Sequence, residues 1–115
     1  MTPVRVTHAT ALILQSLASG ARHGFQIMDV TGLPSGTVYP VLRRLEREGA
    51  LESEWEDADE ASAAGRRRRR IYRLTKAGML LVARARERLE DTQRVLSDPV
   101  LGALGPLGVS GPDRS

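Results

Sequence analysis

Cysteine is absent from the 115-residue chain, and aromatic residues are scarce, with one tryptophan, two tyrosines and one phenylalanine. The lack of cysteine excludes disulfides, thiolate metal sites and a cysteine nucleophile. No apolar run approaches the ~18 residues of a membrane span, and the first ten residues lack the apolar core of a signal peptide. We therefore expect a cytoplasmic protein without a membrane anchor, built as one small domain that cannot enclose a deep substrate cavity.

Lysine is nearly absent as well, since Lys76 is the only one, and the net charge of +3 comes from arginine. Acidic residues gather in the segment 51–60, whereas 65–76 is almost uniformly basic and contains five consecutive arginines. Genomic base composition explains the preference for arginine but not the unbroken run. A basic block at the edge of a domain is typical of a surface for a polyanion, with DNA, RNA and anionic lipid all open.

The first fifty residues carry signals for three helices, at 7–20, 24–30 and 35–48. Thr7 and Ser35 are good N-cap residues, glycines end the first and third segments, and the turn signal TGLP follows the second. The second segment is too short to form a helix alone, so we expect it to fold by packing on its neighbours. The expected core positions of the first and third helices are Ala11, Leu14, Leu17, Ala18, Val38, Val41, Leu42 and Leu45.

The third helix contains two residues that usually weaken helices, Gly36 and Pro40, on the side opposite its apolar stripe. Pro40 would normally clash with the carbonyl group four residues back, but the glycine there has backbone freedom and no side chain. The start of the helix is therefore slim, and Arg43 and Arg47 follow one and two turns behind. Such a shape is suited to entering a groove. Ser35, Thr37 and Tyr39 supply hydroxyl groups at this end.

Two short strands are predicted next, at 50–56 and 69–75, because apolar and polar residues alternate in both segments. The polar, glycine-containing stretch between them, 57–68, is predicted to be a flexible tip. A long helix follows over 76–96, with Thr75 as its N-cap. The order of helices and hairpin is the winged helix-turn-helix plan with an appended helix.

We therefore predict an α+β, mainly α, fold in three parts: a winged helix-turn-helix DNA-binding domain over 1–75, a dimerisation helix over 76–98 and a disordered tail over 99–115. Apolar or small residues recur in the long helix at steps of three and four, as in a coiled-coil seam that three short helices cannot cover. A partner subunit is the favoured cover, and folding back onto the first helix is the alternative. The predicted homodimer interface consists of Val82, Ala85, Leu89, Thr92 and Leu96.

Three separated motifs resemble those of the PadR family of transcriptional regulators, in the branch with a single C-terminal helix. HGFQIM is similar to the opening of the family's second helix, although His23 and Phe25 replace two tyrosines. SGTVYPVLRRLEREGAL, at 35–51, is similar to the recognition-helix signature. RRRIYRLTKAG, at 68–78, is similar to the second wing strand and the start of the last helix. The motifs occur in the family's order, and the resemblance covers about 11–78.

The resemblance implies a homodimer that binds a pseudo-palindromic operator in double-stranded DNA and usually represses transcription. The third helix would enter the major groove, and the wing would lie along phosphates or the minor groove. The matching positions give Ser35, Thr37, Tyr39, Arg43, Arg44 and Arg47 as DNA-binding residues. The last helix has no aromatic residue, which argues against the stacked planar-drug site of multidrug-sensing members. A small-molecule effector is left open, with no chemistry assigned.

The arginines and Tyr39 of the third helix each have an alternative role that does not involve bases. Arg43 and Arg47 point most directly away from the core, but charged residues often do no more than solvate a helix face. Arg44 lies to one side and is expected to reach only phosphate. Tyr39 flanks the apolar stripe, so it is either a core residue or, as we favour, a hydrogen-bond donor to phosphate.

The predicted wing carries a run of five arginines, which we interpret as an electrostatic clamp on phosphates. A disordered basic tract is the alternative. Acidic residues at 57–60 either restrain the tip or repel DNA. Trp55 and Phe25 are expected to pack in the core or the wing. The arginines of the run are Arg66, Arg67, Arg68, Arg69 and Arg70.

No group of residues points to catalysis, a metal or a cofactor. His8 and His23 lack partners at metal-ligand spacing, and no serine lies in a nucleophile motif. We therefore expect a sequence-specific DNA-binding regulator and not an enzyme. The alternative is a winged-helix module that binds other proteins and has no operator of its own, but such a module has no need for a slim, basic third helix.

Overall fold

The computed structural model describes residues 6–97. In chain order the elements are α1 (His8–Ala18), α2 (Gly24–Thr31), α3 (Ser35–Arg47), β1 (Leu51–Trp55), α4 (Ala58–Ala63), β2 (Arg70–Leu74) and α5 (Lys76–Leu96). The strands β1 and β2 form a two-stranded antiparallel sheet. The prediction of a mainly helical fold with one hairpin is thus confirmed. The predicted disordered tail, 99–115, lies outside the described residues.

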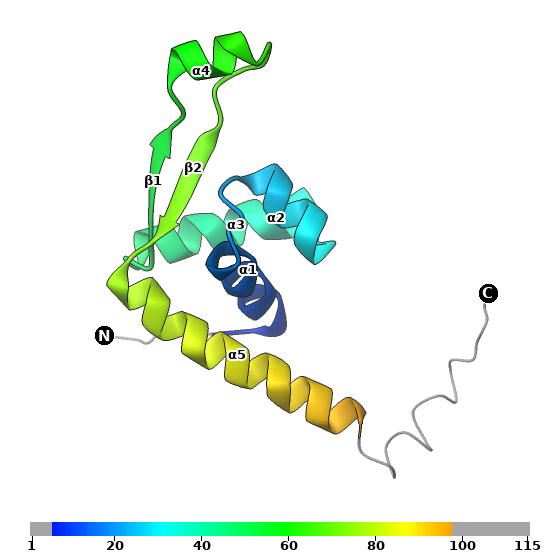
Figure 1. Cartoon of the computed structure of the whole chain (residues 1–115). Helices are drawn as coiled ribbons and strands as arrows, with labels where there is room; N and C mark the ends of the chain where they lie inside the picture. Colours follow the sequence, from blue (N-terminus) through cyan, green and yellow to red (C-terminus); the bar gives the residue numbers. More distant parts are fainter. Residues whose placement is uncertain (1–5, 98–115) are drawn as a thin grey trace, which may run out of the picture.

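Helix α1 lies at the centre of the helical part, with α5 on one side and α2 and α3 on the other (Figure 1). The hairpin rises away from these helices and carries α4 at its tip. Most of the expected core positions are buried, but Val41 is only half-buried and Ala18 is exposed. Ala18 is the last residue of α1, where the chain turns away through Gly20. The fully buried side chains of the core include Ile13, Leu14, Ile27, Val38, Leu42 and Leu45.

The observed N-cap residue of α1 is the predicted one, whereas that of α3 is not. The Thr7 hydroxyl accepts a hydrogen bond from the Thr10 amide at 3.2 Å, as an N-cap should. At α3 the cap residue is Pro34, and Ser35, the predicted cap, is already the first helical residue. The extended backbone of Pro34 presents its carbonyl group to the first turn, so the helix begins without a side-chain cap. It then continues through Pro40, as predicted.

The hairpin has a more ordered tip than the sequence analysis predicted. Its register pairs Leu51 with Leu74 at the base and Trp55 with Arg70 at the outer end. Beyond that pair, α4 replaces the expected flexible loop, so that prediction was wrong. The Asp57 carboxylate accepts hydrogen bonds from two amides of the first turn, which satisfies groups that a short helix otherwise leaves unpaired.

The start of α5 is fixed against the junction between α3 and β1. The Thr75 hydroxyl caps α5 through the Gly78 amide and also donates to the Gly49 carbonyl at 2.6 Å. Gly78 lies directly against the Ala50 carbonyl, and a Cβ atom at this glycine would overlap that oxygen. The absence of a side chain therefore sets how closely α5 approaches the base of the hairpin.

Helix α2 is short and buries only part of its apolar surface. Ile27 is fully buried, but the Phe25 side chain is 64% exposed, so the expectation that it packs in the core or wing was wrong. The two residues are two positions apart and therefore lie on different sides of the helix. The helix is held instead by Ile27 and by the cap that His23 provides.

Candidate nucleic-acid interface

Helix α3 separates a buried side from an exposed one. Val38, Leu42 and Leu45 are completely buried against the rest of the chain. The opposite side is open to solvent and carries Arg43 and Arg47. At the N-terminal end of this side the exposed residues Ser35, Gly36 and Pro40 add little bulk, and Thr37 is half-buried. The sequence analysis therefore placed the outward row of α3 correctly.

Arg44 does not belong to that outward row. Its side chain is half-buried, and its Nη2 atom donates a hydrogen bond to the Thr10 hydroxyl of α1 at 2.8 Å. This contact joins α3 to α1 within one chain. The position predicted to reach phosphate is therefore one where the guanidinium already supports the helix packing.

Tyr39 occupies the core position that the sequence left as the alternative. Its ring is half-buried and packs against the hydrophobic core. It also lies so close to Gly24, at the start of α2, that a Cβ atom at the glycine would overlap the ring. The tyrosine thus fixes the distance between α2 and α3, the two helices of the helix-turn-helix.

Two of the wing arginines, Arg66 and Arg69, bind the carboxylate of Glu56. Arg66 donates to it through both terminal nitrogens, each at 2.6 Å, and Arg69 donates from its backbone amide and its Nη2 atom at 3.3 Å. Arg68 donates to the Glu56 carbonyl group. The hydrogen bonds from Arg66 are the main cause that lowers the pKa of Glu56 to about 2. Arg67 is exposed, so the run divides into arginines that hold the wing and arginines that face solvent.

Arg70 connects the wing to α3. Its Nε atom donates to the Ser53 hydroxyl at 2.9 Å, and that hydroxyl donates to the Glu46 carboxylate of α3 at 2.5 Å. An ion pair of 3.7 Å also joins Arg70 and Glu46. The guanidinium lies over the Trp55 ring, 5.2 Å from its centroid. Trp55 lies against this guanidinium but is 55% exposed, so it is not a core residue.

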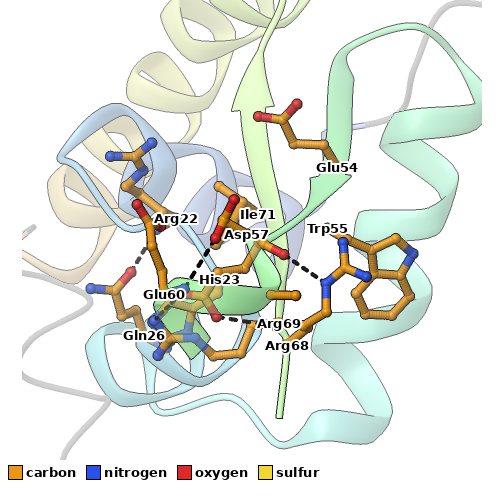
Figure 2. A pocket seen from close by; sticks show the side chains of 12 residues that line it. Arg22, His23, Gln26, Glu54, Trp55, Asp57, Glu60, Arg68, Arg69 and Ile71 are labelled. Atoms are coloured by element: carbon orange, nitrogen blue, oxygen red, sulfur yellow. Dashed lines mark hydrogen bonds and ion pairs between the residues drawn. The ribbon is translucent and has the colours of Figure 1, made fainter. Parts of the chain in front are cut away.

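A charged hollow of about 790 Å³ lies between the start of α2 and the wing (Figure 2). His23, Gln26 and Arg68 are among the residues that line it. His23 caps α2, since its Nδ1 atom accepts from the Gln26 amide. Burial lowers the pKa of His23, and the nearby cations Arg69 and Arg66 lower it further. A lowered pKa favours the neutral imidazole, which the acceptor role of Nδ1 requires.

The predicted seam of α5 is divided between the chain's own core and its surface. Val82 and Ala85 are buried within the single chain, where α5 packs on α1, so they are not open to a partner subunit. This part of the seam folds back onto the first helix, the alternative given above. Leu89 and Thr92 are half-buried, and Leu96 is 69% exposed. An apolar hollow of about 530 Å³ lies beside Leu89, and residues of α1 and α5 line it.

Comparison with known protein families gives a match for this chain. The family model described as the transcriptional regulator PadR-like family matches residues 13–84, from α1 into α5. The chain belongs to the PadR-like family of transcriptional regulators. The members of this family are transcriptional regulators. The resemblance inferred from the three sequence motifs is confirmed.

Individual relatives agree with the family. The transcriptional regulator Rv3488 of Mycobacterium tuberculosis H37Rv is 38% identical over 74 residues, which are 64% of this chain and 58% of the relative. The PadR-like chain thus spans little more than half the length of that relative. A PadR family regulator from Clostridium difficile R20291 has the same fold, with a TM-score of 0.64 at 21% identity over 78% of this chain and 95% of the other.

The fold also resembles Sso10a-2, a DNA-binding protein from Sulfolobus solfataricus, with a TM-score of 0.59 at 20% identity over 93% of this chain and all of that one. Among residues 6–97 of the PadR-like chain, the helices are too short or too polar to cross a lipid bilayer.

Sequence reasoning missed the two acidic residues that organise the wing, Glu56 and Glu46. Glu56 was considered only as part of the acidic segment 51–60, and Glu46 was given no role. A signal did exist, because an acidic residue at the end of a predicted strand lies opposite the arginine run if the two strands form a hairpin. Only the register, however, identifies Arg66 and Arg69 as its partners.

Proposed function

We propose that this regulator is a repressor that acts as a homodimer on a pseudo-palindromic operator. Helix α3 would enter the major groove, with Arg43 and Arg47 toward base edges or phosphates. The observation that carries the proposal is the division of α3 into a fully buried side and an exposed basic side with a slim N-terminal end. A helix that only solvated its surface would not need Gly36 and Pro40 at that end.

The wing would add contacts to phosphates from its exposed arginines. Arg67 and Arg68 are both exposed, and Arg68 keeps its terminal nitrogens for other partners because its Nε atom makes the contact with Glu56. Arg66 and Arg69 support the tip instead. The proposed clamp is therefore smaller than the five-arginine run.

The homodimer would use the outer half of α5. Leu89 still packs against the core, but beyond it the helix extends past the packed part of the chain (Figure 1). Thr92 and Leu96 continue the row of Leu89 toward the C-terminal end of the helix. Val95, next to the row, is also exposed. A second copy that covers this end would reduce the exposed apolar surface. Two-fold symmetry would then place two α3 helices about 34 to 36 Å apart, one turn of DNA.

A selection experiment tests the proposal. The purified chain is incubated with duplexes that contain a randomised central segment, and the bound duplexes are recovered and sequenced. We expect an inverted repeat whose half-sites lie about one helical turn apart. Transcription in vitro from a promoter with that repeat between its recognition elements should fall when the chain is added. Bound duplexes without a repeat would contradict the dimer, and increased transcription would contradict repression.

A further inference from the structure

Trp55 is the only tryptophan of the chain, and its large ring is exposed at the outer end of β1. An isolated exposed apolar residue would need no explanation. Trp55 differs from such a residue because neighbouring side chains hold its ring in a defined arrangement. Burial in the core does not explain that arrangement, because the residue is 55% exposed.

The arrangement is a series of contacts that begins on α3. The Glu46 carboxylate accepts from the Ser53 hydroxyl, which in turn accepts from the Nε atom of Arg70. Arg70 pairs with Trp55 across the hairpin and lies over its ring. A guanidinium bound on both its edge and its face has little freedom, so it restricts the ring as well.

The ring lies on the side of the hairpin that faces α3. Leu51, Ser53 and Trp55 are alternate residues of β1 and therefore share one face of the sheet. Leu51 is buried in the core, and Ser53 contacts Glu46 of α3, so this face is directed toward α3. Trp55 continues it beyond the helix. Figure 2 shows its ring pointing away from His23 at the start of α2.

Charges of both signs lie beside the hairpin on this face. Burial is the first cause that raises the pKa of the Tyr72 hydroxyl, Glu46 raises it further, and Arg70 and Arg43 act against that shift. Glu46 is already paired with Arg70 of β2, whereas Arg43 lies on the exposed side of α3. A partner that reaches Arg43 and the ring together would be anionic and would also present flat apolar groups to the ring.

We propose that Trp55, stacked by Arg70, is a contact of the wing with duplex DNA. The ring packs against the sugar edges of the minor groove next to the major-groove segment that α3 enters, and Arg70 lies toward the adjoining phosphates. This inference rests on the proposed function and adds a residue that no motif assigned. DNA fits better than a second protein chain, because its backbone alternates phosphates with apolar sugar faces and so matches both groups.

The single tryptophan makes a direct test possible. The fluorescence of the full chain is titrated with acrylamide, alone and in complex with a duplex recovered from the selection described above. We expect the bound duplex to protect the ring, which lowers the acrylamide quenching constant severalfold. A duplex that binds while Trp55 stays as accessible as in the free protein overturns the inference and leaves the proposed function intact.

Binding measurements with variants complete the test. Trp55→Ala should weaken duplex binding on the order of tenfold, with an unchanged salt slope because no charge is lost. Trp55→Phe should restore most of the affinity. Phe25→Ala, which removes an equally exposed ring from α2, is the matched control and should bind as the parent does. Equal affinity of the parent and a Trp55→Ala variant that has the parent's circular dichroism spectrum overturns the inference.

Two further outcomes would overturn the inference, and the first of them would identify a second subunit as the occupant of this surface. If acrylamide accessibility of Trp55 rises on dilution in the absence of DNA, a second subunit covers the ring and the inference is overturned. If no selected or mixed-sequence duplex binds at all, the proposed function fails and the inference fails with it. Because the acrylamide measurement uses the parent chain, it remains a test of the inference should Trp55→Ala not fold.

Discussion

The Glu56 carboxylate accepts hydrogen bonds from both terminal nitrogens of Arg66, each at 2.6 Å, although its own side chain is only 9% exposed. The wing is thereby closed on itself by an ion pair that is partly shielded from water. Among the five arginines of the run, Arg66 and Arg69 hold the wing tip and Arg70 connects the wing to α3, whereas Arg67 and Arg68 are exposed. This division determines how substitutions in the run should behave.

Glu56→Gln should weaken the wing in a pH-dependent way. The pKa of Glu56 is lowered from its ordinary value of 4.5 to about 2, so its contribution to stability is complete above pH 4.5 and is lost as the pH falls toward 2. The difference in thermal midpoint between parent and variant should shrink over that interval. Glu52→Gln removes an exposed ion pair with Arg73 and should shift the midpoint little at any pH. A difference that persists at pH 2 would argue against the ion pair as its cause.

Arg47→Glu should abolish operator binding and leave the fold intact, because the side chain projects from the exposed side of α3 and contributes nothing to the core. Circular dichroism measures the fold, and a gel-shift assay with a selected duplex measures binding. Arg84→Glu makes the same charge reversal on an exposed position of α5 and should keep most of the affinity. Unchanged binding by a folded Arg47→Glu variant would remove α3 from the interface.

Substitutions of different wing arginines should differ in how they change the salt dependence of DNA binding. Arg67→Ala removes an exposed cation, so the slope of the logarithm of the binding constant against the logarithm of salt concentration should decrease by about 0.9. Arg66→Ala should leave that slope nearly unchanged and should instead increase hydrogen exchange at α4 and the wing tip. A change in base preference with a constant slope for Arg67→Ala would mean that this arginine reads sequence.

Leu96→Glu should yield monomers with much weaker operator binding. The side chain is 69% exposed in the single chain, so the charge costs little in the monomer but would be buried at the proposed interface. Light scattering measures the assembly state. Leu80→Glu, at the other end of α5 and 73% exposed, is the matched control and should remain dimeric. The reverse result would place the interface at the N-terminal end of α5. Leu89 is a poorer test position because it already packs against the chain's own core.

Gly78→Ala should destabilise the protein by about 1 to 3 kcal/mol, because the added methyl group meets the backbone carbonyl of Ala50, which cannot move aside freely. Gly36→Ala is the contrasting variant, since no atom lies within 4 Å of a Cβ atom there. It should be neutral or stabilising by up to about 1 kcal/mol, and it should reduce DNA affinity by widening the slim end of α3. Chemical denaturation and gel-shift assays measure the two effects. A Gly78→Ala variant as stable as the parent would show that α5 can move away from the hairpin.

Local sequence patterns were enough to predict the family, the two strands and every helix of the described residues except α4. Apolar spacing placed α1, α3 and α5, and alternation placed β1 and β2, because these signals depend on residues close together in the chain. The sequence analysis failed at the tip, where the cap at Asp57 was overlooked. It also correctly separated the inner and outer sides of α3.

Which polar groups contact one another depends on the tertiary structure. Arg44 binds Thr10, 34 positions away, and Glu56 binds arginines 10 and 13 positions away. Val82 and Ala85 are covered by α1 and not by a second copy. A guanidinium binds the phosphates of a polyanion and a carboxylate of its own chain equally well. A small apolar side chain likewise packs equally well against a helix of its own chain and against a second copy. In both cases the partner is chosen by the crossing of helices and the register of strands, which local sequence does not specify.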